Sequence, residues 1–152
     1  LALVSDAGTP GISDPGNKLI ESVIKELGDN VNVIPVPGPS ALITAASASG
    51  FPMDKFLFLG FPPVKNKRRK FFEEILSSSY PVIFYESPYR IVKTLKELSS
   101  FLTEELSSLK IVVCRELTKK FETTYRGTVE EVLEKLNQEK IRGEFVVAVE
   151  RK

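Results

Sequence analysis

Acidic and basic side chains suited to proton transfer or charge stabilisation follow two apolar stretches of this 152-residue chain. One stretch spans residues 80–85 and the other spans residues 109–114. The chain has no histidine, so carboxylates and lysines would have to act as bases. The candidate catalytic residues are Glu86, Arg90, Arg115, Glu116 and Lys119. Structural ion pairs, Glu86 with Arg115 or Glu116 with Lys119, are the alternative interpretation.

A glycine-rich segment from Asp6 to Gly16 is the first candidate ligand loop. It holds three glycines and two prolines in eleven residues, which lets backbone amides and carbonyls approach a ligand closely. The Gly-Lys-Ser/Thr of a phosphate loop and the spaced glycines of a dinucleotide fingerprint are both absent. The pattern therefore favours a ligand without phosphates. A tight turn before a helix is equally compatible with the spacing.

A second rigid turn, Pro37 to Ala41, precedes a run of small residues that predicts a helix. Small side chains at this point leave room for a flat ring, although a close-packed helix start explains them as well. Both turns follow predicted strands. In a sheet with alternating strands and helices, such turns lie at the same edge, where ligands bind.

The densest positive charge of the chain lies in one short segment before Phe71 and Phe72. Five cations occur in six residues, Lys65, Lys67, Arg68, Arg69 and Lys70. Such a cluster favours salt-dependent binding of nucleic-acid phosphates, and a solvated helix face is the plain alternative. The two phenylalanines continue the helical face of Ile75 and Leu76, so we expect them in the core.

The hydrophobic pattern predicts an α/β fold. Strands are expected at residues 1–5, 31–36, 56–61, 80–85, 109–114, 123–126 and 144–149. Helices are expected from Asp14 as N-cap and Pro15 to Gly28, at 40–49 and 66–76, around Ile91, Leu95 and Leu98, and at 129–136. A change of texture near Met53 predicts a domain boundary, with domains at 1–53 and 54–152.

Composition narrows the function classes. With one cysteine, Cys114, and no histidine, a disulfide, a zinc site and a Ser-His-Asp triad are not expected, and we expect no metal. No apolar run is long enough to cross a bilayer, so we expect a cytoplasmic protein without membrane contact. The net charge of +1 neither favours nor excludes a nucleic-acid partner. Because the chain starts inside a predicted strand, we expect an N-terminal portion to be missing.

Several segments closely match motifs of a known family. The longest is the run from Ser5 to Gly16, Ser-Asp-Ala-Gly-Thr-Pro-Gly-Ile-Ser-Asp-Pro-Gly. The match continues through residues 36–41, 58–61, 84–88, 114–122 and 143–145. On these motifs the chain resembles the ribosomal RNA small-subunit methyltransferase I family of the tetrapyrrole methylase superfamily. The members' opening strand and their Glu-Asp-Thr-Arg segment are not in this sequence.

The resemblance implies a specific fold and activity. It implies a parallel-sheet upper domain, of which only a remnant is in this sequence, a mixed-sheet lower domain, and a homodimer. It implies S-adenosylmethionine as cofactor and 2′-O-methylation of a cytidine ribose in small-subunit (16S) ribosomal RNA, free or in the 30S subunit. The residues expected at the cofactor are Asp6, Gly8, Thr9, Ile12, Ser13, Ser40, Ala41, Tyr85, Glu86, Glu144 and Phe145, and those at RNA are Lys65, Lys67, Arg68, Arg69 and Lys70. The alternatives are a precorrin or uroporphyrinogen methyltransferase and a non-catalytic dimerisation or RNA-binding fragment.

Overall fold

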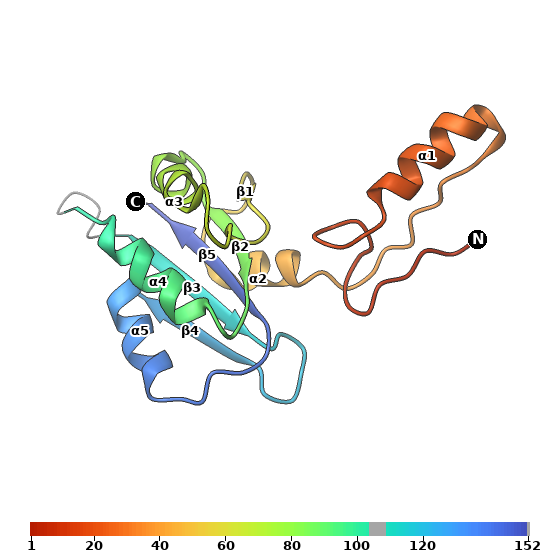
Figure 1. The fold of residues 1–152 in the computed structure, drawn as a ribbon. Coiled ribbons are helices and arrows are strands. Elements are labelled where there is room, and N and C mark those ends of the chain that lie inside the picture. Colours follow the sequence, from red (N-terminus) through yellow and green to blue (C-terminus); the bar gives the residue numbers. More distant parts are fainter. Residues whose placement is uncertain (104–108, 152) are drawn as a thin grey trace. The chain divides into compact units, whose positions relative to one another are not determined.

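The computed structural model describes residues 1–103 and 109–151 (Figure 1). The chain divides into two compact units, an N-terminal unit of Leu1–Ala41 and a C-terminal unit of Leu42–Lys152. The domain boundary expected near Met53 refers to the complete two-domain fold and stays a prediction.

The N-terminal unit contains one α-helix, α1 (Asn17–Leu27), followed by a short 3-10 turn, Gly28–Asn30. The strands predicted at residues 1–5 and 31–36 are wrong for this structure, because neither segment forms a ladder with another described segment. A strand needs a hydrogen-bonded neighbour, and apolar sequence alone does not supply one. Val33, Ile34 and Val36 are accordingly exposed.

The start of α1 differs from the prediction. Gly16, and not Asp14, occupies the N-cap, and no side chain caps the helix. The backbone angle φ is 58° at Ser13 and 147° at Gly16, so the chain leaves the helical region of φ/ψ space on both sides of Pro15. The prolines and glycines of this loop therefore shape a turn, and the helix begins only at Asn17.

The C-terminal unit is built on one five-stranded mixed sheet, as expected for the lower domain. Its strands are β1 (Leu57–Phe58), β2 (Val82–Glu86), β3 (Lys110–Arg115), β4 (Thr123–Gly127) and β5 (Phe145–Glu150). The spatial order is β1-β2-β5-β3-β4, with β1 and β2 parallel and the other pairs antiparallel. The helices are α2 (Ala41–Ser49), α3 (Arg68–Ser77), α4 (Ile91–Ser100) and α5 (Val129–Asn137).

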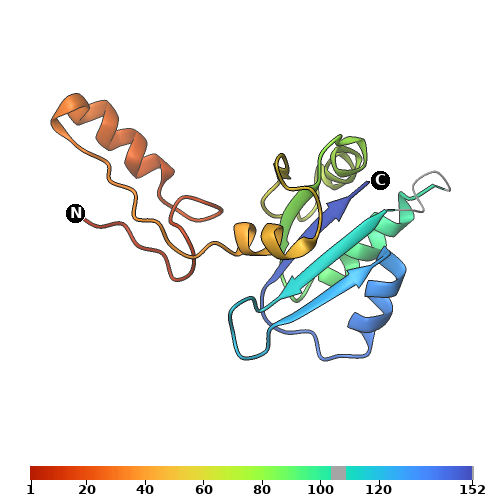
Figure 2. The same cartoon turned by 180° about the vertical axis from the view of Figure 1, so that it is seen from behind.

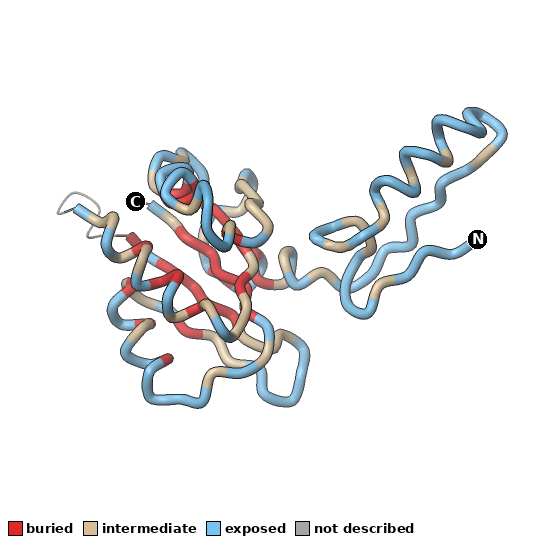
Figure 3. The backbone as a smooth tube through the Cα atoms, in the orientation of Figure 1, coloured by how far each residue is buried: buried red, intermediate tan, exposed pale blue. Residues whose placement is uncertain are grey.

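Both faces of the sheet are covered, which explains why β5 is apolar almost throughout. Phe84 and Val147 face a core closed by α3, α4 and α5, where Phe71 and Phe72 are buried as expected. Ile83 and Ala148 face the opposite side, where the small side chains of α2 pack against the sheet. Figures 1 and 2 show these two layers from opposite sides, and Figure 3 shows that burial concentrates in the strands between them.

The sheet topology brings several connections to one end of this unit. β2 and β3 are both antiparallel to β5, so these two strands run in the same direction, and β1 runs with them. The carboxyl ends of β1, β2 and β3 therefore lie at the same end of the sheet as the start of β5. We call this the carboxyl end of the sheet. Among the described residues, no helix is long and apolar enough to span a membrane.

Candidate functional site

Three of the predicted site residues occupy one row at the carboxyl end of the sheet. Phe145 on β5 pairs with Glu86 on β2 and with Arg115 on β3. Glu116, Lys119 and Glu144 lie in the adjoining connections. The predicted catalytic residues around Glu86 and those around Arg115 therefore lie at the same end of the sheet, although the two segments are far apart in the sequence.

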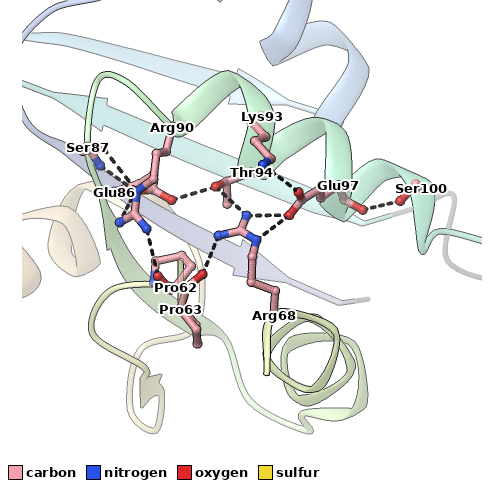
Figure 4. A network of polar contacts seen from close by, with 10 residues as sticks. All are labelled: Pro62, Pro63, Arg68, Glu86, Ser87, Arg90, Lys93, Thr94, Glu97 and Ser100. Carbon is pink, nitrogen blue, oxygen red and sulfur yellow. Dashed lines mark hydrogen bonds and ion pairs between the residues drawn. The ribbon is translucent and has the colours of Figure 1, made fainter. Parts of the chain in front are cut away.

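Glu86 lies at the centre of a buried polar network (Figure 4). Its side chain is fully enclosed. Oε1 accepts a hydrogen bond from the amide of Ser87 at 2.7 Å and pairs with the Arg90 guanidinium at 2.8 Å, while Oε2 accepts from Thr94 Oγ1 at 2.7 Å. A buried carboxylate needs such partners to remain charged. The ion pair considered between Glu86 and Arg115 does not form, because Arg90 takes that position.

The same network holds Arg68, one of the five predicted RNA contacts. Its guanidinium donates to Thr94 Oγ1 at 3.1 Å, to the carbonyl of Pro63 at 2.8 Å and to Glu97 at 2.7 Å. It also lies over the ring of Phe72, 5.4 Å from the centroid. Only 12% of the Arg68 side chain is exposed, so its charge is committed to internal contacts.

The other four cations of that segment lie on the surface. Arg69 pairs with Glu73 one helical turn later, at 2.8 Å, and remains largely exposed. Lys65, Lys67 and Lys70 are exposed. RNA binding by this segment stays a prediction, and its accessible members are the three lysines and Arg69.

Arg115 is anchored by the connection that leads into β5. Its Nε donates to the carbonyl of Arg142 at 2.9 Å, and NH1 pairs with Glu139 at 3.0 Å. The same carboxylate oxygen of Glu139 accepts a hydrogen bond from the Tyr125 hydroxyl at 2.8 Å. Burial, followed by this bond to Glu139, raises the pKa of Tyr125. Arg115 therefore orders the start of β5 in the structure described here.

Glu116, Lys119 and Glu144 form an ion-paired triad beside that anchor, in which Lys119 and Glu144 are exposed and Glu116 is partly buried. Lys119 Nζ donates to Glu116 Oε1 at 3.1 Å and to Glu144 Oε2 at 2.8 Å. The ion pair between Glu116 and Lys119, given above as the alternative to catalysis, is therefore present. The amide of Glu144 also donates to Glu116 Oε1, at 3.0 Å. This backbone bond, with Lys119, lowers the pKa of Glu116, and the two carboxylates raise the pKa of Lys119. Each of these two shifts favours the charged form of its group.

The remaining predicted residues of this unit lie on different faces. Tyr85 lies on the α2 side of the sheet, with its ring 5.0 Å from that of Phe58 and 5.5 Å from that of Phe61. Phe145 is buried in the core under the helices and offers almost no accessible side-chain surface. Glu144, next to it, is exposed. Cys114 is buried, and burial raises the pKa of its thiol.

The predicted cofactor loops approach each other within the N-terminal unit. A side-chain carbon added at Gly8 would lie 4.0 Å from the carbonyl oxygen of Pro39. Gly8 and Gly11 both have a positive φ, which glycine adopts without strain. Asp6, Gly8, Thr9, Ile12, Ser13 and Ala41 are exposed and Ser40 is partly exposed. Both turns therefore offer accessible backbone in one region.

A family model identifies the chain. The model described as "Tetrapyrrole (Corrin/Porphyrin) Methylases" matches residues 1–133. The chain belongs to this family.

Known structures agree at the level of fold. The methyltransferase CobJ is 19% identical with a TM-score of 0.64, covering 95% of this chain and 62% of CobJ. Uroporphyrin-III C-methyl transferase from Thermus thermophilus, complexed with S-adenosyl homocysteine, is 18% identical with a TM-score of 0.58, covering 93% of this chain and 62% of that protein.

Curated relatives are more similar in sequence. A protein named "Ribosomal RNA small subunit methyltransferase I" from Halalkalibacterium halodurans is 45% identical over 99% of this chain and 50% of its own length. Proteins of the same name from Vibrio cholerae and Escherichia coli O157:H7 are 46% and 43% identical, over 98% and 99% of this chain and 51% of each relative. The chain thus spans about half the length of these relatives.

Sequence reasoning missed the partners that hold the candidate residues in place. Thr94 lies on the core face of α4 with Leu95 and Leu98, and a polar residue on an apolar face is a signal that a buried partner exists. Glu139 carries no such signal, because it follows α5 in a charged segment. Glu139 reaches Arg115 only in the folded unit, where the connection from α5 to β5 passes the end of β3. Among the described residues, no group of three or more acidic or cysteine side chains is arranged to hold a metal ion.

Proposed function

We propose that the protein acts in S-adenosylmethionine-dependent methyl transfer, and that its substrate is the ribose 2′-hydroxyl of a cytidine in small-subunit ribosomal RNA. The observation that carries the proposal is a contrast in identity. Relatives named as ribosomal RNA methyltransferases are 38–46% identical over nearly the whole chain, whereas the tetrapyrrole methyltransferases of known structure are 16–19% identical.

The N-terminal loops suit the proposed cofactor. S-adenosylmethionine carries no phosphate, and the loop from Asp6 to Gly16 contains no cation. Its exposed amides and hydroxyls can hydrogen-bond an adenosine and an amino acid, and the Asp6 carboxylate complements a positively charged group. Gly8, Thr9, Ile12 and Ser13, with Ser40 and Ala41, are the residues that would hold it.

When bound, S-adenosylmethionine supplies an electrophilic methyl group on a sulfonium. The contribution of the chain is orientation of the acceptor hydroxyl and management of its proton, and orientation alone lowers barriers by up to ~7–11 kcal/mol in favourable systems. Lys119 and Glu116 are accessible enough to contact a substrate. We assign the cation beside the acceptor to Lys119, which Glu116 and Glu144 keep protonated and in place. A cation there would favour the deprotonated hydroxyl, whose proton would leave to solvent water.

We assign different roles to the predicted catalytic residues. Glu86 and Arg90 are engaged with one another and with the α4 turn, and Arg115 with the start of β5. These three would act as positioning residues. The ion-paired triad of Glu116, Lys119 and Glu144 is the part of the carboxyl end that we expect at the substrate. The homodimer and the 30S partner also remain proposals.

The cofactor claim is tested by calorimetric titration of S-adenosylmethionine into this chain and into a Gly8→Trp variant, whose ring would fill the first loop. Binding that the variant abolishes supports the proposal. Binding that survives in the variant places the cofactor elsewhere. If neither protein binds, residues 1–152 do not form a cofactor site by themselves.

The substrate claim is tested separately by methyl transfer from labelled S-adenosylmethionine to unmodified 30S subunits, to free 16S ribosomal RNA and to uroporphyrinogen. Label in the RNA at a cytidine 2′-oxygen supports the proposal. Label in uroporphyrinogen instead would assign the chain to tetrapyrrole modification. A Lys119→Met variant that retained full transfer would remove Lys119 from the mechanism.

A further inference from the structure

Three exposed aromatic side chains lie at the carboxyl end of the sheet, one after each of three strands. Phe61 follows β1, Tyr89 follows β2 and Phe121 follows β3, and they are 50%, 95% and 67% exposed. Because β1, β2 and β3 run in the same direction, all three connections meet at this end of the sheet. Figure 1 shows the turn before α4 and the loop between β3 and β4 close to the start of β5.

The loop that carries Phe121 is held in one conformation by its own hydrogen bonds. The amide of Lys119 donates to the carbonyl of Glu116 at 2.9 Å, and the amide of Glu122 donates to the carbonyl of Lys119 at 3.1 Å. The Thr118 amide donates to the Glu122 carboxylate. The ring of Phe121 is therefore presented to solvent from an ordered loop, next to the triad of Glu116, Lys119 and Glu144.

Tyr89 is presented in a similar way. It lies in a turn closed by hydrogen bonds from the amides of Arg90 and Ile91 to the carbonyl of Ser87, at 3.1 and 3.0 Å. The ion pair from Arg90 to Glu86 ties this turn to the buried network. Because a tyrosine side chain has few rotatable bonds and this one lies on a hydrogen-bonded turn, its ring loses little conformational freedom when a ligand stacks on it.

Lysine side chains lie near the rings of Tyr89 and Phe121. Lys120 Nζ lies 5.6 Å from the centre of the Phe121 ring. Tyr89 lines a hollow of about 470 Å³ together with Lys93 and Lys96, which follow it on α4. Of the acidic groups nearby, Glu97 pairs with Lys93 at 3.8 Å and with Arg68, and Glu116 and Glu144 share Lys119. The Glu122 carboxylate next to Phe121 accepts a hydrogen bond from the Thr118 amide, and lysines lie beside both rings.

We infer that Tyr89 and Phe121 are stacking platforms for unpaired bases of a single-stranded RNA, and that Lys93, Lys96 and Lys120 contact its phosphates. Aromatic rings interspersed with cations suit single-stranded RNA, because every base offers a face for stacking and every linkage carries a charge. A protein partner would favour a continuous apolar patch instead. The inference rests on the proposed function and adds to it which residues bind the RNA that flanks the acceptor.

The test measures fluorescence anisotropy of a labelled single-stranded oligoribonucleotide of about ten nucleotides, a length within known single-strand site sizes. It compares the full chain with Phe121→Ala and Tyr89→Ala. Phe121→Tyr and Tyr89→Phe are matched variants that keep a ring, and Val64→Ala removes an exposed apolar side chain elsewhere. Circular dichroism checks that each variant is folded.

We expect each alanine variant to bind about tenfold more weakly, equivalent to about 1.4 kcal/mol, and the ring-keeping variants and Val64→Ala to bind like the parent. The slope of affinity against salt should be unchanged by Phe121→Ala, and Lys120→Ala should reduce it by about one unit. Folded alanine variants that bind like the parent, or a parent that does not bind single-stranded RNA, would overturn the inference.

Titration of S-adenosylmethionine into the same samples separates this inference from the proposed function. If the parent binds the cofactor and the alanine variants keep their RNA affinity, the assignment of the stacking residues is refuted and the proposed function is not. If neither the parent nor the variants bind the cofactor but the alanine variants lose RNA affinity, the stacking assignment is supported and the methyl-transfer proposal fails. Uroporphyrin is titrated into the same samples. If the alanine variants lose uroporphyrin binding while their RNA affinity is unchanged, the rings bind a macrocycle and the inference is overturned.

Discussion

Thr94 Oγ1 donates a 2.7 Å hydrogen bond to the buried carboxylate of Glu86, from a helix to the end of a strand eight residues earlier. The same oxygen accepts a bond from Arg68 on α3. One hydroxyl therefore links β2, α3 and α4 at the place where the candidate site begins.

Replacing Thr94 with valine keeps the shape of the side chain and removes the hydroxyl. Glu86 Oε2 would lose its hydrogen-bond donor Thr94 Oγ1 inside the core, and an unsatisfied buried acceptor costs about 1–3 kcal/mol. Urea unfolding followed by circular dichroism measures this loss. Ser100→Ala removes an exposed hydroxyl of the same helix and should change stability by less than about 0.5 kcal/mol. Equal effects of the two substitutions would show that the network is not stabilising.

Arg90→Met and Lys93→Met compare a buried with an exposed ion pair on one helix. Arg90 pairs with fully enclosed Glu86 at 2.8 Å, whereas Lys93 is 70% exposed and lies 3.8 Å from Glu97. Breaking the buried pair should cost roughly 3 kcal/mol, and breaking the exposed pair less than about 1 kcal/mol. Chemical denaturation of both variants tests the difference. A small effect of Arg90→Met would indicate that water reaches Glu86.

Gly143→Ala should distort the triad at the start of β5. Gly143 has φ 82°, and an added methyl group would collide with the side chain of Glu116. Gly50→Ala is the matched control, since Gly50 has φ 79° but open space around it. Strain from the positive φ should destabilise both variants by about 1–2 kcal/mol, and only Gly143→Ala should add the collision. Thermal unfolding measures the stability of each, and equal losses would argue against close packing on Glu116.

The pKa of Glu116 should be measurably low by carbon NMR titration. The group is more acidic in the folded chain than in the unfolded chain, so its contribution to stability is present above the ordinary glutamate pKa and is lost as pH falls through the folded value. Because the Glu144 amide is the largest cause, Lys119→Met should move the pKa only part of the way back. A full return to the ordinary value in Lys119→Met would mean that the lysine dominates.

The sequence predicted the C-terminal unit well where local pattern and burial agree. The apolar runs at 80–85, 109–114 and 144–149 became β2, β3 and β5, because residues covered on both faces must be apolar along their whole length. Thr128 and Glu131 form a capping box, which fixes the start of α5 at Val129. The same reasoning failed for residues 1–5 and 31–36, since strands form only with neighbours.

For the candidate site, the sequence alone identified residue types and motifs, and tertiary structure decided which groups meet. The motifs around Glu86 and Arg115 could be recognised in the sequence, because each motif is a short run of neighbouring residues. That Glu86 pairs with Arg90 and Thr94, that Arg115 pairs with Glu139, and that Arg68 turns inward depended on packing. Ion pairs across a fold are selected by strand register and burial, and neither property is encoded in the spacing of two residues along the chain.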